Sequence, residues 1–243
     1  APLVPGFVTV PFNDLEAVRA AVTDRTVAVF LELVQGEGGI NIATPEYVKG
    51  LRRLCDEKDL LLVADEVQTG VGRTGTMFAY QNYGIEPDMM TMAKALGGGL
   101  PIGAVLVKDR VASLVRPGMH GSTFGGSPLI TKAALGVFKA ISADKMLKNA
   151  KSMGAYLLER LNGFKERYAI IREVRGIGLM IGVELTIEGK GIFEDCLANG
   201  VVINCTQGKV LRIMPALNVT KKQVDRALFV LDKALQKAAG EAS

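Results

Sequence analysis

Several features of common protein classes are scarce in this sequence, and each absence narrows the range of functions. No uninterrupted apolar run is long enough to span a bilayer, and no basic, apolar, small-residue segment of the leader type opens the chain. The 29 basic and 25 acidic residues are dispersed and leave a net charge of only +4, which argues against nucleic acid or an anionic membrane as a partner. The three cysteines, Cys55, Cys196 and Cys205, lack the spacing of a zinc site. We therefore expect reduced thiols, no metal site and a cytoplasmic protein.

What is present is the composition of a globular protein. Hydrophobic residues make up 49% of the 243 positions and charged residues 22%, enough for one large domain or two modest ones with a substantial core. The first residues, "APLVPGFVTVPFND", contain no initiator methionine and read as a loop that leads into a helix. We therefore expect the chain to be part of a longer protein.

Strand-like and helix-like segments alternate in the first 140 residues. Short apolar runs predict strands, the first two buried on both faces, at residues 27–33, 60–65, 88–93 and 103–107. Asn13 and Glu16 have the spacing of a capping box for one helix, and Thr44 with Pro45 predicts the start of another. This alternation predicts an α/β layered domain with a mainly parallel sheet.

The pattern changes from about residue 127. A long helical stretch, two β-like runs, a short helix and two short strands follow, at residues 146–164, 169–176, 178–185, 192–198, 201–204 and 210–214. Thr220 and Gln223 predict a capping box for the last helix. We expect residues 1–140 to be part of a large α/β domain and residues 141–243 to form a smaller α+β domain.

Three charged residues follow successive predicted strands: Glu32, Asp65 and Lys94. Parallel sheets bind ligands outside the carboxyl ends of their strands, so these side chains should converge in one crevice. The alternative is a set of surface ion pairs. That alternative is the better explanation for any one of the three, and convergence is the better one for all three together.

The segment "GVGRTG" (Gly70–Gly75) matches the spacing of a dinucleotide-binding fingerprint. The fingerprint needs its glycines at the turn between strand and helix, whereas here "EVQT" intervenes and no clear helix follows. No strand-end acid stands about twenty residues further on, where a ribose partner is expected. We therefore do not predict a Rossmann site.

Lys94 stands directly before the glycines Gly97, Gly98 and Gly99. A lysine that forms an imine with an aldehyde must lose its proton within reach of the ligand, and glycines let the backbone pass that ligand closely. Pyridoxal phosphate is an aldehyde whose ring nitrogen must stay protonated, and a carboxylate such as Asp65 would hold that proton. The residues thus predict complementary roles for Lys94 and Asp65.

Four blocks of the sequence resemble a known family. They are "LELVQGEGG", "LLLVADEVQTGVGRTG", "MAKALGGGLPIGA" and "HGSTFGGSPL", and their order and spacing resemble those of class III (subgroup II) pyridoxal-phosphate aminotransferases of the acetylornithine and ornithine type. The resemblance covers essentially the whole chain. It implies the α/β fold of type I pyridoxal-phosphate-dependent transferases, with a large mainly parallel domain and a smaller C-terminal one, and a homodimer with shared active sites.

The resemblance also implies roles for residues of these blocks. Lys94 would form the Schiff base with pyridoxal 5'-phosphate and later carry the proton, and Asp65 would pair with the pyridinium nitrogen. Gln68 would bond the phenolic oxygen of the ring. Ser122 and Thr123 would bind the cofactor phosphate of the neighbouring subunit, which requires a dimer.

Glu32 and Arg212 form a second implied pair. In the family, a glutamate of the first block bonds the arginine of an "LR-x-x-P" block and releases it when a dicarboxylate arrives; here Arg212 stands in "VLRIMPAL". A released guanidinium would hold the substrate carboxylate through two parallel hydrogen bonds. The alternative is a structural bridge between domains. Leu33 and Val34 stand where the family has a proline, a departure that can loosen the switch.

The implied reaction is a transamination in arginine biosynthesis. The side-chain amine of N-acetylornithine, or of a close derivative, becomes a semialdehyde, and 2-oxoglutarate becomes glutamate. Ornithine, succinylornithine and 4-aminobutyrate are alternative donors, and glutamate-semialdehyde aminomutase is an alternative enzyme with this fold and lysine. The family's N-terminal half, which carries further cofactor contacts, has no counterpart in these 243 residues, so an inactive scaffold fragment is the non-enzyme alternative.

Overall fold

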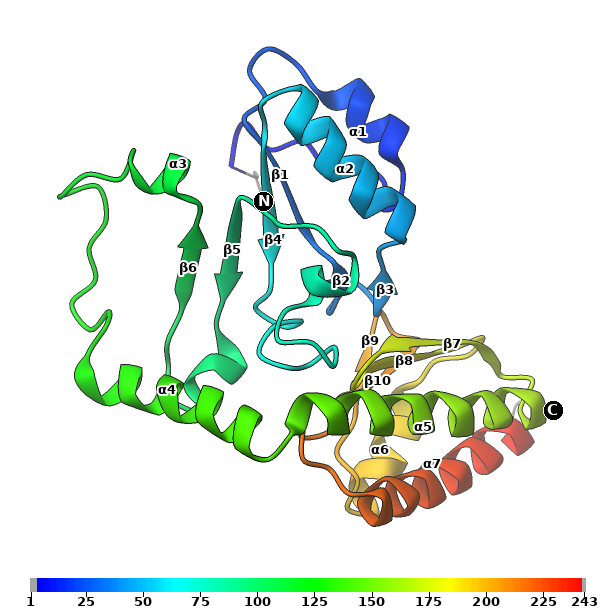
Figure 1. The fold of residues 1–243 in the computed structure, drawn as a ribbon. Coiled ribbons are helices and arrows are strands. Elements are labelled where there is room, and N and C mark those ends of the chain that lie inside the picture. The colour runs from blue at the N-terminus through cyan, green and yellow to red at the C-terminus, as the bar shows by residue number, and fades with distance from the viewer. Residues whose placement is uncertain (1–3, 242–243) are drawn as a thin grey trace.

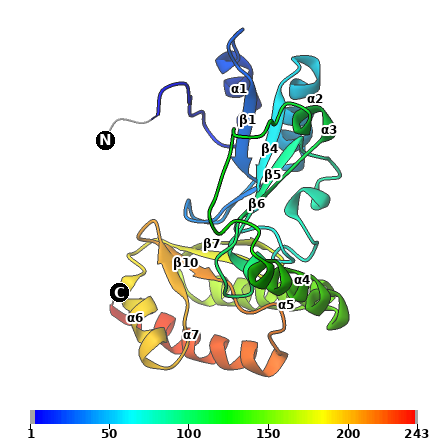
Figure 2. The same cartoon turned by 90° about the vertical axis from the view of Figure 1, so that its left-hand side faces the viewer.

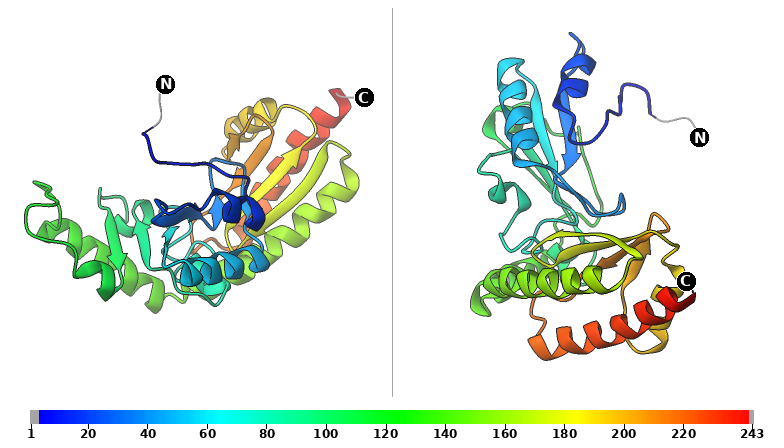
Figure 3. Two further views of the ribbon diagram at one scale, coloured as in Figure 1. Left: turned by 90° about the horizontal axis from the view of Figure 1, so that it is seen from above. Right: turned by 90° about the vertical axis from the view of Figure 1, so that its right-hand side faces the viewer.

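Two four-stranded β-sheets, a two-stranded one and their helices make up the described part of the protein. The computed structural model describes residues 4–241. One four-stranded sheet belongs to the N-terminal half and the other to the C-terminal half. The helix α4 (Pro128–Ala143) packs against the first sheet, and α5 (Met146–Arg167), which follows it, packs against the second (Figure 1). Figures 2 and 3 show that the N-terminal sheet lies on one side of the C-terminal sheet, and the C-terminal helices α6 (Lys190–Ala198) and α7 (Lys221–Glu241) lie on the other. None of the helices in the described residues combines the length and apolar character needed to cross a bilayer.

The first sheet has four strands in the order β1-β4-β5-β6. These are β1 (Ala28–Glu32), β4 (Leu61–Asp65), β5 (Met89–Met92) and β6 (Ala104–Val107). β1, β4 and β5 are parallel, and β6 runs antiparallel to β5. The predicted mainly parallel sheet is therefore confirmed, and the carboxyl ends of its three parallel strands meet at one edge.

Only one face of this sheet is packed by helices. Along β4, Leu62 and Ala64 are buried, whereas the residues between them are half-buried. The buried face packs against α1 (Leu15–Ala21), α2 (Pro45–Glu57) and α4. Phe30 of β1 lies on the other face and is 55% exposed. The prediction that the first strands are buried on both faces is therefore wrong for this chain, because the described helices cover one face only.

The first two helices begin with side-chain caps. Asp14 caps α1 by accepting a hydrogen bond from the first turn, so the predicted cap at Asn13 is wrong by one residue. Asn13 instead has a φ of 64°, and its side chain bonds the carbonyl of Ile42 and the N–H of Thr44. It thereby ties the entry to α1 to the start of α2. Thr44 caps α2, as predicted, with Pro45 in the first turn.

The C-terminal sheet is antiparallel in the order β7-β8-β10-β9. Its strands and remaining helices are β7 (Ile171–Ile177), β8 (Met180–Leu185), β9 (Asn204–Thr206), β10 (Val210–Ile213), α6 (Lys190–Ala198) and α7 (Lys221–Glu241). The predicted capping box is confirmed: Thr220 and Gln223 exchange hydrogen bonds of 2.8 and 3.3 Å with each other's backbone. The strand predicted from Val201 begins only at Asn204, because Val201 N–H still bonds Cys196 in α6.

The long helical stretch predicted at residues 146–164 is confirmed as α5, and a separate helix, α4, precedes it. Lys145, with a φ of 52°, separates α4 from α5. The expected domain boundary near residue 140 lies close to this break, and the division into domains there stays a prediction. Short elements complete the chain: β2 (Val34–Gln35), β3 (Asn41–Ile42), the 3-10 turns η1 (Ala79–Asn82) and η2 (Lys94–Gly97), and α3 (Asp109–Ala112).

Candidate active site

The strand-end residues singled out from the sequence lie in one row. Glu32 pairs in register with Asp65 across β1 and β4, and Asp65 pairs with Thr91 across β4 and β5. Partners in register on parallel strands project from the same face, so all three belong to the face that carries Phe30. Lys94 follows Thr91 by three residues, at the start of η2. The structure thus brings Glu32, Asp65 and Lys94 to one edge of the sheet.

Asp65 is held by hydrogen bonds to one of its two carboxylate oxygens. Its Oδ1 accepts from Val67 N–H at 2.9 Å and from Thr91 Oγ1 at 3.1 Å. These bonds fix the carboxylate plane and leave Oδ2 for a donor on a ligand. A half-buried carboxylate with one oxygen occupied suits the binding of a cationic N–H group.

Lys94 has an unusual backbone. Its φ of 45° lies in the left-handed region, which a non-glycine residue seldom adopts. Its side chain is exposed. The positive charge of Lys94 acts on two carboxylates, since it opposes the rise in the pKa of Glu32 and contributes to the lowered pKa of Glu37. Strained backbone of this kind is concentrated at functional positions.

Arg212 has a different partner from the one expected. Its Nη1 donates to Glu37 Oε1 at 2.6 Å and to Gln68 Oε1 at 3.3 Å, and Gln68 Nε2 donates to Glu37 Oε1 at 3.3 Å. The expected pairing of Arg212 with Glu32 is therefore wrong. Glu32 ends β1 beside Asp65 of β4, whereas Glu37 lies in the turn after β2, which reaches the C-terminal sheet.

The Glu37–Arg212 pair is asymmetric in its burial. The Arg212 side chain is 11% exposed and the Glu37 side chain 69%. The hydrogen bond from Arg212 holds the pKa of Glu37 below its ordinary value. An ion pair with one exposed partner contributes at most about 1 kcal/mol to stability. Because the Glu37–Arg212 bond is this weak, the carboxylate of a ligand can replace Glu37 while the Arg212 guanidinium stays in place.

Glu32, without that partner, bonds the backbone nearby. Its Oε2 accepts from Gly36 N–H at 3.2 Å. Burial raises the pKa of Glu32, and the negative charge of Asp65 adds to that rise. Glu32 is thus a half-buried carboxylate beside a second one.

Ser122 and Thr123 lie apart from this row. Both are exposed, on the loop that connects α3 to α4. In Figure 1 this loop runs outside β6, with β5 and β6 between it and β4. The structure therefore does not bring Ser122 and Thr123 to Asp65 and Lys94 of the same chain.

A buried carboxylate, that of Glu66, holds the loop after Asp65 in place through hydrogen bonds. Glu66 is 1% exposed and accepts hydrogen bonds from Thr69 Oγ1 at 2.5 Å and from Ala79 N–H and Tyr80 N–H at 3.0 Å. Burial raises the pKa of Glu66, and these hydrogen bonds oppose the rise. They fix the loop that presents Gln68 to the site.

The Gly70–Gly75 loop docks the N-terminal half on the C-terminal half. Arg73 donates to Leu179 O at 3.0 Å and to Pro215 O at 2.6 Å, while Leu179 N–H donates to Arg73 O at 3.0 Å. Gly72 and Gly75 both have positive φ, and a Cβ at either would collide with a side chain of the C-terminal half or of α5. The glycines thus permit close packing between the two halves.

Two site residues were not found from the sequence. Thr91 was a detectable polar position inside the apolar run "MMTMA", three residues before Lys94. Glu37 is the second glutamate of "LELVQGEGG", and its position in a glycine-rich turn was the available signal. Only the fold reveals that Glu37 meets Arg212.

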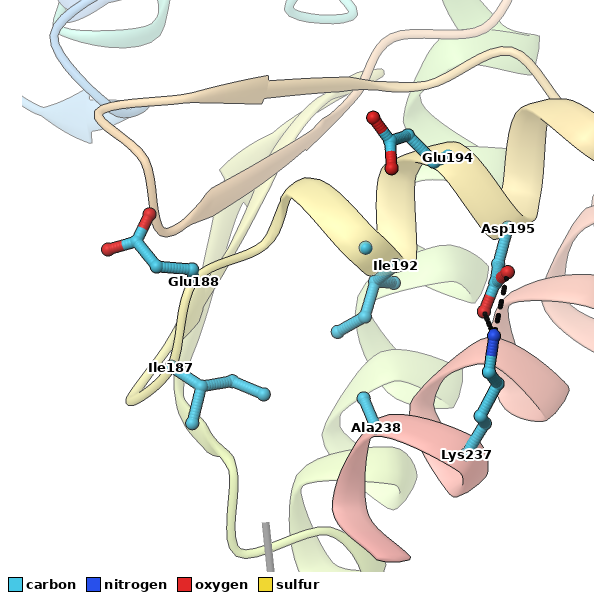
Figure 4. Close-up of a pocket in the computed structure, with 8 residues that line it drawn as sticks. Ile187, Glu188, Ile192, Glu194, Asp195, Lys237 and Ala238 are labelled. Atoms are coloured by element: carbon cyan, nitrogen blue, oxygen red, sulfur yellow. Dashed lines mark hydrogen bonds and ion pairs between the residues drawn. The ribbon is translucent and has the colours of Figure 1, made fainter. Parts of the chain in front are cut away.

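A separate hollow of about 330 Å³ lies between α6, α7 and the end of β8. Figure 4 shows its lining, in which Lys237 bonds both oxygens of Asp195 at 2.9 and 3.1 Å, with Glu188 and Glu194 toward the solvent. It contains none of the strand-end residues. Its geometry therefore adds nothing to the row of Glu32, Asp65 and Lys94.

The side chains at the sheet edge match the groups of pyridoxal phosphate that a protein must hold. A primary amine, an amide and a carboxylate with a free oxygen lie at Lys94, Gln68 and Asp65. These groups fit the aldehyde, phenolic oxygen and ring nitrogen of the cofactor. Gly98 and Gly99, both with positive φ, leave the backbone beside Lys94 without side chains. The residues present fit the ring of the cofactor.

The family pattern described as "Aminotransferase class-III" matches residues 6–235. The chain belongs to this family. It is 50% identical over 234 residues to an acetylornithine aminotransferase of Methanocaldococcus jannaschii and 47% identical over 235 residues to one of Caldanaerobacter subterraneus. Each match covers 96% of this chain, which spans 58% and 60% of the relatives' lengths. The resemblance inferred from the four sequence blocks is thereby confirmed.

A solved structure supports the same relationship. The ornithine aminotransferase from Toxoplasma gondii, with partial occupancy of PLP at its active site, superposes with a TM-score of 0.94 at 33% identity. The match covers 100% of this chain and 58% of the Toxoplasma chain. The predicted fold, that of the pyridoxal-phosphate-dependent aminotransferases, is therefore confirmed.

Proposed function

We propose that this chain is the lysine-bearing and C-terminal part of an aminotransferase that moves the side-chain amine of N-acetylornithine to 2-oxoglutarate. The observation that carries the proposal is the register of Glu32, Asp65 and Thr91, with Lys94 three residues beyond. An amine and a carboxylate at neighbouring strand ends are the pair that a pyridoxal ring requires. The acetylornithine aminotransferases that this chain resembles support the choice of donor.

Three side chains at this edge of the sheet have distinct tasks in the proposed reaction. Pyridoxal 5'-phosphate, when bound, supplies an electron sink that makes a C–H bond of the donor acidic. Asp65 Oδ2 keeps a proton on the ring nitrogen, while Val67 N–H and Thr91 hold Oδ1. Lys94 Nζ would hold the cofactor at its aldehyde and would carry the proton to and from the substrate carbon. Gln68 would bond the phenolic oxygen.

Arg212 and Glu37 adapt the site to two unlike substrates. The donor presents an amine to the cofactor, whereas 2-oxoglutarate carries a second carboxylate. When the donor is bound, Glu37 neutralises Arg212, as in the 2.6 Å pair. When 2-oxoglutarate arrives, its carboxylate takes the place of Glu37 on the guanidinium. Since Glu37 is mostly exposed, this exchange requires little desolvation.

A second copy of the chain completes the site in this proposal. Ser122 and Thr123 are exposed on a loop that lies away from Asp65 of the same chain, with Phe124 beside them 79% exposed. Hydroxyl and backbone N–H groups of such a loop can bind a phosphate. We propose a homodimer in which each loop binds the cofactor phosphate of its neighbour. We place the enzyme in the cytoplasm because three unpaired thiols suit a reducing compartment.

Ornithine is the second candidate donor, favoured by the match to the Toxoplasma ornithine aminotransferase. The test offers each donor to the full-length protein with 2-oxoglutarate and measures glutamate. We expect faster release with N-acetylornithine. Release with ornithine alone would reassign the donor. No release with either, together with no borohydride-fixed cofactor on Lys94, would contradict the aminotransferase proposal.

A further inference from the structure

The hydrogen bond of Glu32 reaches the turn that carries Glu37. Glu32 Oε2 accepts from Gly36 N–H at 3.2 Å, and Gly36 directly precedes Glu37. Gly36 O in turn accepts from Gly39 N–H at 3.3 Å, which closes the turn. A carboxylate at the end of β1 therefore anchors the first peptide of the segment that occupies Arg212.

Gly36 is also packed against Gln68. A Cβ at position 36 would collide with the Gln68 amide. That amide bonds both members of the pair, accepting from Arg212 and donating to Glu37, each at 3.3 Å. The position of Gly36 thus determines where Gln68 and Glu37 meet Arg212. A shift of this turn would disturb both contacts together.

The placement of Glu32 is unfavourable by itself. It is half-buried and lies in register beside Asp65, so two carboxylates share one end of the sheet. Burial raises the pKa of Glu32, as expected for a carboxylate that the fold does not fully compensate. Charged groups kept at such positions are candidates for a functional role. The bond to Gly36 supplies a role for this one.

We propose that Glu32 is a positioning residue that holds the Gly36 turn so that Glu37 occupies Arg212 whenever no dicarboxylate is bound. Glu32 thereby sets the affinity of the site for the dicarboxylate substrate without touching it. The inference rests on the proposed function, in which Arg212 binds that substrate. Glu32 affects how often Glu37 occupies Arg212, and has no part in the proton transfer at Lys94.

The test measures the binding of glutarate, a dicarboxylate with no amine and no keto group, to the full-length protein by calorimetry. Glu37→Ala frees Arg212 and should tighten binding by about two- to fivefold, the range expected for an exposed ion pair. Glu32→Ala should tighten it similarly and speed hydrogen exchange at Gly36 N–H. Glu32→Gln keeps an acceptor oxygen and should stay within about twofold of the natural protein, because an amide oxygen can replace the carboxylate as acceptor.

Two further variants make the result decisive. Glu32→Met removes the acceptor at similar volume and replaces Glu32→Ala should that variant fail to fold. Glu159→Ala, an exposed glutamate on α5, is the control and should leave glutarate binding unchanged. Tighter binding in Glu37→Ala with no change in Glu32→Ala or Glu32→Met would overturn the positioning role and keep the proposed switch. No change in Glu37→Ala would overturn the switch, and the inference with it.

Discussion

The carboxylates at the two ends of the N-terminal sheet differ in how fully the fold pairs them with cations and hydrogen-bond donors. At the amino end of β5, Asp88 is 3% exposed and accepts from Leu62 N–H at 2.9 Å and from Arg52 at 2.7 Å, with Arg110 at 3.1 Å. At the carboxyl end, Glu32 and Asp65 lie side by side, with Lys94 as the nearby cation.

This difference separates a structural charge from a functional one. At the amino end, burial alone would raise the pKa of Asp88, yet the bonds from Leu62 N–H and Arg52 lower it. The carboxylate is therefore compensated within the fold. At the carboxyl end, Asp65 keeps one oxygen for a ligand, and burial raises the pKa of Glu32. Charges that the fold leaves uncompensated are candidates for functional roles.

The largest effect should come from Lys94→Ala. Without the amine, borohydride treatment should fix no pyridoxal phosphate on the full-length protein, and transamination should fall by at least about a thousandfold, as expected when a nucleophile and proton carrier is lost. Mass spectrometry of the reduced protein measures the attachment. Lys108→Ala, which removes a lysine from the amino end, is the control. Equal loss of attachment in both variants would contradict the contrast between the ends.

The next largest effect should be on stability, in Asp88→Asn. The substitution removes the buried anionic partner of Arg52, while the exposed Asp56 stays at 2.8 Å, so the free energy of unfolding should fall by about 1.5–3 kcal/mol, the range for hydrogen bonds to charged groups. Urea unfolding at pH 7 measures the change. The pKa of Asp88 is lowered in the folded state, so its contribution is complete above about pH 4 and is lost as the pH falls through the lowered value.

The pH dependence supplies the control for this variant. The difference in unfolding free energy between the natural protein and Asp88→Asn should shrink as the medium is made more acidic than about pH 4. A difference that stays constant down to pH 2 would show that the charge of Asp88 is not what stabilises the strand.

Asp65→Asn should reduce turnover by about a hundredfold, because it removes a preorganised charge at the ring nitrogen. The amide oxygen can still accept from Val67 N–H and Thr91, so the unfolding free energy should change little. Thr91→Val, which removes one neutral hydrogen bond, should lower turnover by no more than about tenfold. Steady-state kinetics and thermal unfolding of the two variants check this order. The reverse order would contradict the role of Asp65.

The smallest effect should be a gain in stability. Glu32→Gln removes a carboxylate whose pKa the fold raises by burial. The ionised carboxylate therefore disfavours folding above the ordinary glutamate pKa of about 4.3. The variant should gain less than about 1 kcal/mol at pH 7, since Glu32 is only half-buried. The gain should vanish as the pH falls below about 4. A loss of stability at pH 7 would show that the fold compensates the charge of Glu32 despite its burial.

Local sequence patterns predicted those features of the fold and the site that depend on residues close together in the chain. Apolar runs predicted the strands, and the residues after them predicted that Glu32, Asp65 and Lys94 share one edge. The role of Glu37 was not predicted because its partner, Arg212, is 175 positions away in the chain, and no local spacing indicates that contact. The exposure of Phe30 was not predicted for a related reason. An apolar run indicates a strand, but whether a second layer covers that strand depends on the rest of the fold.

The backbone of Lys94 has a consequence for laboratory evolution. Its φ of 45° is a conformation in which glycine avoids a penalty of about 1–2 kcal/mol. A library randomised at this codon and selected for heat resistance alone should therefore become enriched in glycine, whereas selection for growth that needs the reaction should restore lysine.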